Sequence, residues 1–121
     1  MAGSVLLIED EPHIIEAITF ILERDGWRVT AHSDGASAVD RAVSAKPNVV
    51  ILDAMLPGRT GFEILRDLRA RPDMADLPVL MLTAKGQAKD REAAEAAGAS
   101  RFMTKPFANQ DVLEAVRALA G

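Results

Sequence analysis

The chain has 121 residues, of which 49% are hydrophobic and 26% charged, as expected for one soluble globular domain. It contains no cysteine, which excludes disulfides and thiolate metal sites, and no apolar run reaches the roughly 18 residues of a membrane span. The net charge of −4 and the 4% aromatic content give no general reason to bind nucleic acid. We therefore expect a cytoplasmic protein that forms a single domain.

Five short apolar runs predict the strands of a buried sheet. They lie at residues 5–8, 27–33, 48–53, 78–83 and 100–104. Most of these runs are rich in β-branched side chains and are not interrupted by polar residues, which is typical of strands buried on both faces. The second run alternates more weakly, and it places Trp27, Val29 and Ala31 on one face, where we expect Trp27 to pack in the core or at the sheet edge.

Each strand is followed by apolar residues at helical spacing. The predicted helices lie between Pro12 and Gly26 and at residues 36–46, 60–71, 88–97 and 112–119. Pro12 suits a first helical turn behind an acidic cap, and Gly26 suits a helix end. Thr60 and Glu63 match a capping box. The helix at 88–97 offers only small apolar side chains, so it should pack weakly and be mobile.

A strand followed by a helix, five times over, predicts the α/β class. Such (βα)5 chains form a flavodoxin-like, doubly wound parallel sheet of five strands, in the order 2-1-3-4-5, with helices on both faces. In this order the first and third strands are neighbours. The carboxyl ends of the strands share one edge, where ligands bind in open α/β sheets. Asp10 and Asp53 are therefore expected to lie close together.

Polar residues follow four of the predicted strands, namely Glu9, Asp10, Asp53, Thr83 and Lys105. Each alone could be a solvated loop residue or a helix cap, but five of them at one edge indicate a site. Three crowded carboxylates repel one another unless a cation intervenes, and an oxygen-only donor set favours Mg²⁺. With Lys105 as a further positive charge and Thr83 as a neutral donor, the set describes phosphoryl transfer onto Asp53 and later hydrolysis.

Over essentially its whole length the chain resembles the receiver domain of two-component response regulators. The matching motifs are Glu9-Asp10, Asp53 after an apolar strand, Pro57, Gly61, Thr83-Ala84 and Lys105-Pro106-Phe107. The resemblance implies one receiver domain over residues 1–121, in which Asp53 accepts a phosphoryl group from a sensor histidine kinase or a phosphotransfer protein. It also implies a signalling switch that assists its own phosphorylation and dephosphorylation, rather than a conventional enzyme.

The same resemblance assigns a Mg²⁺ site. Asp10 and Asp53, together with the backbone carbonyl of Met55, would bind the ion. Glu9 would act through a bound water or reach the ion directly, because the pair is Glu-Asp where the family often has Asp-Asp. Met55 and Lys85 lie at variable positions that help to set the lifetime of the phosphoryl group in the family.

A second group of residues is implied to report phosphorylation. Lys105 would pair with the phosphoryl group, Thr83 would move to hydrogen-bond it, and Phe102 would turn inward by packing alone. The Lys105-Pro106 peptide bond is expected to be cis. The face made by the fourth helix, fifth strand and fifth helix would meet an output partner or effector domain, without direct contact to nucleic acid or membrane. A homodimer, a stand-alone regulator and a fragment of a larger protein all fit the sequence.

Other interpretations of the sequence are less well supported. A haloacid dehalogenase type of hydrolase needs a second acid where Met55 stands, and a receiver that works without phosphate would not need the complete set of polar residues. A flavodoxin-like electron carrier lacks its phosphate-binding loop after the first strand. Three basic residues, Arg66, Arg69 and Arg71, are expected on the exposed face of the third helix, and His32 is expected away from the site.

Overall fold

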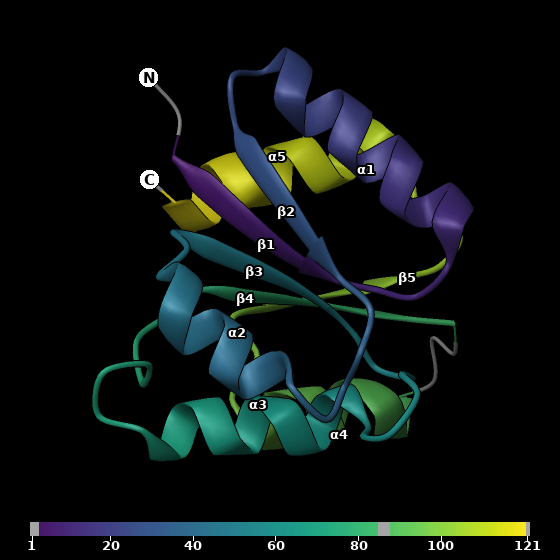
Figure 1. Ribbon diagram of the computed structural model, residues 1–121. Helices are drawn as coiled ribbons and strands as arrows, with labels where there is room; N and C mark the ends of the chain where they lie inside the picture. Colours follow the sequence, from purple (N-terminus) through teal and green to yellow (C-terminus); the bar gives the residue numbers. More distant parts are fainter. Residues whose placement is uncertain (1–2, 85–87, 121) are drawn as a thin grey trace.

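The computed structural model describes residues 3–84 and 88–120, which form a parallel sheet covered by helices (Figure 1). The strands are β1 (Ser4–Ile8), β2 (Arg28–His32), β3 (Val49–Asp53), β4 (Val79–Thr83) and β5 (Arg101–Thr104). The helices are α1 (Pro12–Arg24), α2 (Ala38–Ala45), α3 (Gly61–Ala70), α4 (Ala88–Ala97) and α5 (Asn109–Ala120). The strand order is β2-β1-β3-β4-β5 with every pair parallel, which confirms the predicted topology. Within these residues no helix has the length and apolar character needed to span a membrane.

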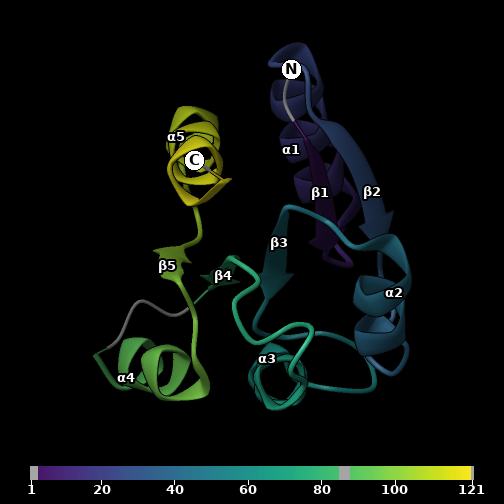
Figure 2. The same cartoon turned by 90° about the vertical axis from the view of Figure 1, so that its left-hand side faces the viewer.

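The core lies in two layers, one on each face of the sheet. Figures 1 and 2 show α1 and α5 on one face and α2, α3 and α4 on the other. Alternate residues of β3 serve the two layers: Ile51 packs on the α1 and α5 side, and Leu52 packs against α3. All five residues of β3 and all five of β4 are buried. The central strands are therefore held from both faces, and this fixes the positions of their carboxyl ends.

The helix-end signals of the sequence are largely confirmed. Gly26 has a φ of +94° just after α1, a conformation that glycine adopts without strain. Thr60 and Glu63 form the complete capping box of α3, since each side chain accepts a hydrogen bond from the other residue's backbone amide. An acidic residue, Glu11, occupies the N-cap of α1 in front of Pro12 as expected, but its side chain makes no capping bond to the helix.

The edge strand β2 departs from its predicted pattern. Trp27 is 8% exposed and packs in the layer beneath α1 and α5, as expected for a core residue. Ala31 was expected on the same buried face, but it is exposed. The reason is that β2 has a neighbouring strand on one side only, so the cover from α1 reaches Trp27 and Val29 but not the far end of the strand.

Arg69 does not lie on a solvated helix face, so this expectation is wrong. Its Nε donates a hydrogen bond to the Gly98 carbonyl at 2.9 Å. Its Nη1 donates to the carbonyls of Met74 and Leu77 at 3.2 and 2.6 Å. Gly98 has a φ of +100°, and a Cβ there would lie 2.9 Å from Cγ of Arg69. Arg69 therefore ties the end of α3 to the carboxyl end of α4.

Helix α4 is sparsely packed, as its composition predicts. Ala94 and Ala97 are its buried residues among those described. Their small side chains remove little apolar surface from water compared with the leucines and isoleucines of the other helices. The carboxyl end of α4, held by Arg69, is better anchored than these two alanines alone would allow. The mobility of α4 stays a prediction.

Candidate functional site

Three carboxylates gather at the carboxyl edge of β1 and β3. One oxygen each from Glu9, Asp10 and Asp53 lies within 4.8 Å of the others. The pairing of Ile8 with Leu52 places the ends of the two strands side by side and so brings these residues together. Glu9 is 0% and Asp53 3% exposed, whereas Asp10 faces solvent. The three acidic residues singled out in the sequence thus share one place.

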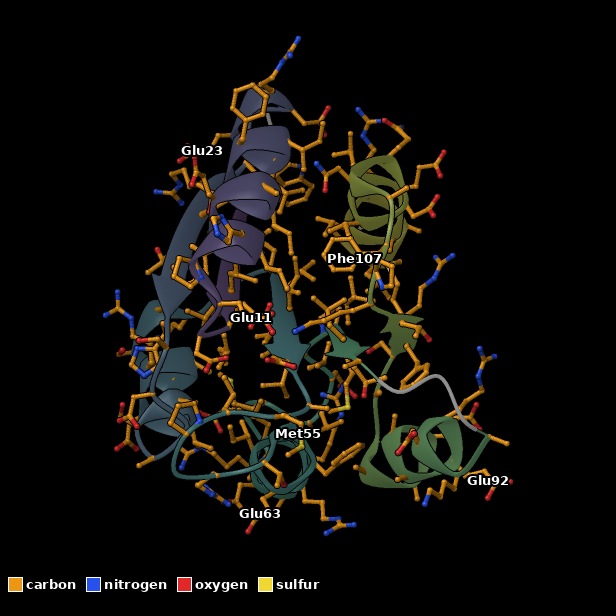
Figure 3. The ribbon with its side chains drawn as sticks, turned by 90° about the vertical axis from the view of Figure 1, so that its right-hand side faces the viewer. Glu11, Glu23, Met55, Glu63, Glu92 and Phe107 are labelled. Atoms are coloured by element: carbon orange, nitrogen blue, oxygen red, sulfur yellow. The ribbon has the colours of Figure 1, made fainter. Side chains whose placement is uncertain are left out.

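Lys105 completes this cluster from the end of β5. Its Nζ lies 3.0 Å from Oε1 of Glu9, 3.3 Å from Oδ1 of Asp53 and 3.7 Å from Oε1 of Glu11. The peptide bond between Lys105 and Pro106 is cis, as predicted. Figure 3 shows Glu11, here turned toward the site, with Met55 and Phe107 around the ends of the central strands. Nothing in the sequence singles out Glu11 as a site residue beyond its place in an acidic run.

The buried carboxyl of Glu9 sets the electrostatics of the site. Burial raises the pKa of Glu9, and a hydrogen bond with Asp53 raises it further, although Lys105 opposes both effects. Burial alone would lower the pKa of Lys105, but its contacts with Glu9 and Asp53 outweigh burial and raise it. Oε2 of Glu9 accepts from the amides of Asp10 and Glu11 at 3.0 and 3.2 Å. One lysine therefore faces more negative charge than it can neutralise.

The donor set fits a hard divalent cation. Oε1 of Glu9 is buried and has no well-aligned hydrogen bond, only the ion pair with Lys105, so it retains capacity to bind a positive ion. Asp10 and Asp53 add carboxylate oxygens from two further positions, so the candidate metal ligands found among the described residues are all oxygens. Because the protein supplies few oxygens and Asp10 is exposed to solvent, the site has room for the waters that Mg²⁺ retains. Lys85, which the sequence marks as a variable position, lies outside the described residues.

The loop after β3 (residues 54–60) is closed at its base. Met55 and Thr60 form an isolated bridge, and the Gly61 amide donates to the Ala54 carbonyl at 2.8 Å. A Cβ at Gly61 would lie 2.3 Å from the carbonyl oxygen of Asp53, which excludes any larger residue. The side chain of Met55 is 67% exposed, and its amide lies 3.3 Å from Oδ1 of Asp53. The loop thus starts and ends against Asp53.

Thr83 and Phe102 lie on the same face of the sheet. Thr83, 5% exposed, ends β4, and Phe102 pairs with Met81 two residues earlier on that strand. Phe102 is half-buried and packs against the layer that contains α4. The guanidinium of Arg91, from α4, lies 5.6 Å from the centre of the Phe102 ring. Thr83 and Phe102 therefore lie on the α4 side of the sheet, and Phe102 contacts α4 through Arg91.

The loop between β2 and α2 (residues 33–37) was missed by sequence reasoning. The Glu9 amide donates to the His32 carbonyl at 3.1 Å, so the backbone of His32 borders the acidic cluster, while its side chain bonds Ser37 in this loop. The Gly35 amide donates to the Pro57 carbonyl, also at 3.1 Å. Asp34-Gly35 is visible in the sequence as a turn, but no local pattern indicates which segment the turn will contact.

The family model of the response regulator receiver domain matches residues 5–117, and the chain belongs to this family. It is 41% identical over 116 residues to the probable transcriptional regulatory protein TcrX of Mycobacterium tuberculosis, covering 96% of this chain and 49% of the relative. It is 35% identical over 119 residues to the phosphate regulon transcriptional regulatory protein PhoB of Escherichia coli, covering 98% and 52%. The chain thus spans about half the length of these curated relatives.

Solved structures support the same family and fold. The chemotaxis protein CheY4 of Vibrio cholerae is 28% identical with a TM-score of 0.90, covering 98% of this chain and 99% of that one. The receiver domain of the sensor histidine kinase PA1611 of Pseudomonas aeruginosa is 31% identical with a TM-score of 0.87, covering 100% and 99%. That structure holds a magnesium ion in its active-site cleft. The predicted flavodoxin-like fold and receiver family are therefore confirmed, and neither the hydrolase nor the electron-carrier alternative gains support.

Proposed function

We propose that this domain is a phosphorylation-controlled switch of a two-component system and that Asp53 is its covalent acceptor. The observation that carries the proposal is the position of Asp53, buried at a strand end, 3.3 Å from Nζ of Lys105 and beside Glu9 and Asp10. A sensor histidine kinase or a phosphotransfer protein would supply the phosphoryl group. We take residues 1–121 as this one domain, acting in the cytoplasm.

The chemistry follows from the groups around the acceptor. A carboxylate oxygen of Asp53 attacks the phosphorus of a phosphohistidine, so a P–O bond forms while the P–N bond breaks and the imidazole leaves. Lys105 pairs with the transferred oxygens. Asp10, Asp53, the Met55 carbonyl and Glu9, directly or through water, would hold Mg²⁺, which when bound would neutralise charge on the phosphoryl oxygens. Water later attacks the phosphorus and releases phosphate, which regenerates the carboxylate, so the domain assists its own dephosphorylation.

The readout of phosphorylation would pass through Thr83 and Phe102 toward α4. Thr83 would hydrogen-bond the new phosphoryl oxygens, and Phe102 would turn further inward on the same face of the sheet. The sparse packing of α4 supports this proposal, because a weakly held helix can be shifted by a small difference in free energy between two arrangements. The altered face of α4, β5 and α5 would then bind an output partner or effector domain.

Intact-mass measurement after incubation with acetyl phosphate and Mg²⁺ tests the acceptor. We expect a gain of one phosphoryl mass in the wild type and none in Asp53→Asn. Asp111→Asn, on the exposed side of α5, is the matched control and should be labelled like the wild type. An unlabelled wild type, or equal labelling of Asp53→Asn, would refute the assignment. Beryllium fluoride with Mg²⁺, followed by NMR at Thr83 and Phe102, tests the readout separately, and an unchanged Phe102 signal despite binding would count against it.

A further inference from the structure

The loop at residues 33–37 lies directly against the loop at residues 54–60, and Figure 1 shows the two connections side by side at the carboxyl edge of the sheet. Gly35 is buried there, and its amide donates to the Pro57 carbonyl at 3.1 Å. A Cβ at Gly35 would lie 2.8 Å from that oxygen and 3.0 Å from the backbone nitrogen and oxygen of Arg59. Because these are backbone atoms, they cannot rotate aside as a flexible side chain can. Glycine alone permits this approach.

The turn that presents Gly35 is fixed by its own side chains. Oδ1 of Asp34 accepts from the Ala36 amide at 3.2 Å, and Oδ2 accepts from the Ser37 hydroxyl at 2.8 Å. Nε2 of His32 lies 2.8 Å from the same hydroxyl oxygen. The hydroxyl proton points to Asp34, so His32 is the donor in this second bond. This chain of hydrogen bonds holds Gly35 in place from both sides of the turn.

The loop at 54–60 is consequently held at two points. Its base is fixed by the Met55–Thr60 bridge next to β3, and its tip is fixed by Gly35 through Pro57. A displacement of the tip would strain the segment between these two points, which begins at Met55, whereas Asp53 is held in a fully buried strand.

We propose that Gly35 is a positioning residue for the cation site. By holding Pro57, it keeps the backbone carbonyl of Met55 in place beside Asp53, although Gly35 itself touches neither. This inference rests on the proposed function, in which the Met55 carbonyl binds Mg²⁺. It extends that function to the β2–α2 loop, which follows directly on His32, the last residue of β2, whose carbonyl accepts from the Glu9 amide.

Titration of the protein with MgCl₂, followed by NMR, tests the proposal. Gly35→Ala should weaken Mg²⁺ binding by about 10-fold, as is typical when the support of a metal ligand is lost. Gly26→Ala is the matched control: it strains a residue of φ +94° at the opposite end of α1, and it should bind Mg²⁺ like the wild type. Asp34→Ala removes the bonds of the turn without adding atoms, so it should fold and show a smaller loss.

Each outcome decides a different point. Wild-type affinity in a folded Gly35→Ala protein, or in Asp34→Ala if the first variant does not fold, would overturn the positioning role alone. A wild type that binds no Mg²⁺ would refute the proposed function and the inference with it. In the metal-free wild type the Gly35 amide should be protected from hydrogen exchange, and exchange at the rate of a free amide would show that Pro57 is not held.

Discussion

Replacing Arg69 with methionine should destabilise the domain, although the residue belongs to what the sequence presents as an exposed basic cluster. Methionine keeps an unbranched apolar stem and removes every N–H donor. The carbonyls of Met74, Leu77 and Gly98 then lose the charged donor that they share. Because these carbonyls belong to the α3–β4 loop and to the end of α4, the substitution loosens the contact between two elements.

The expected loss of stability follows from the three hydrogen bonds to these carbonyls and from the hydration of the guanidinium, which opposes them. A hydrogen bond contributes a net 1 kcal/mol or so, and somewhat more when the donor is charged. The guanidinium gives up part of its hydration to make these bonds, and this burial lowers the pKa of Arg69. Arg69 is only half-buried, so water can replace part of what is lost. We therefore expect a loss of about 2 kcal/mol and a melting temperature lower by about 8 °C.

Urea denaturation followed by the fluorescence of Trp27 measures this loss, since Trp27 is the single tryptophan and is buried. The midpoint should fall while the slope of the transition stays unchanged. Arg66→Met, three residues earlier on the exposed face of α3, should stay within about 0.5 kcal/mol of the wild type. The midpoint of Arg69→Lys should be intermediate, because one ammonium group cannot reproduce the forked N–H donors of the guanidinium. Equal midpoints for Arg69→Met and Arg66→Met would refute the reasoning.

Three further predictions concern the helix cap, an ion pair and the cation. Thr60→Ala removes the acceptor for the Glu63 amide and should lower the free energy of unfolding by about 1 kcal/mol; an unchanged urea midpoint would contradict this. Arg117 holds the pKa of Asp25 below its ordinary 3.8, so this stabilisation is present above that pH and lost below it. In Arg117→Ala the free energy of unfolding should therefore fall less than in the wild type as the pH is lowered through about 4 in an acid titration. Mg²⁺ at about ten times its Kd should stabilise the wild type by about 1.4 kcal/mol in calorimetry against EDTA, and Asp10→Asn should abolish this gain.

The parts of the fold and site that the sequence predicts are those with local causes. An unbroken apolar run followed by Asp53 is a buried strand that ends in a polar residue, whatever surrounds it. Parallel strands share one edge, so Thr83 and Lys105 reach that edge by topology alone. The backbone bond of 2.7 Å between the Lys105 amide and the Thr83 carbonyl is a direct result of that shared edge.

The features that the sequence does not predict have causes distant along the chain. The bonding partners of Arg69 come from two other segments, and one of them, Gly98, lies 29 residues away. Gly35 meets Pro57 only because β2 and β3 both flank β1 in the sheet. Glu11 stands at the N-cap of α1 without a side-chain capping bond, and its carboxylate lies 3.7 Å from Nζ of Lys105, a partner that lies far away along the chain.

The groups of the site differ in how firmly they are held. Glu9 and Asp53 are buried at the ends of strands that are covered on both faces, so the distance between the two carboxylates is set by the sheet. Met55 lies on a loop and is largely exposed, so its carbonyl depends on contacts outside the sheet. Substitutions in the β2–α2 and β3–α3 loops should therefore alter cation affinity while leaving the acceptor in place. Changes in the sheet itself would disturb the acceptor and the fold together.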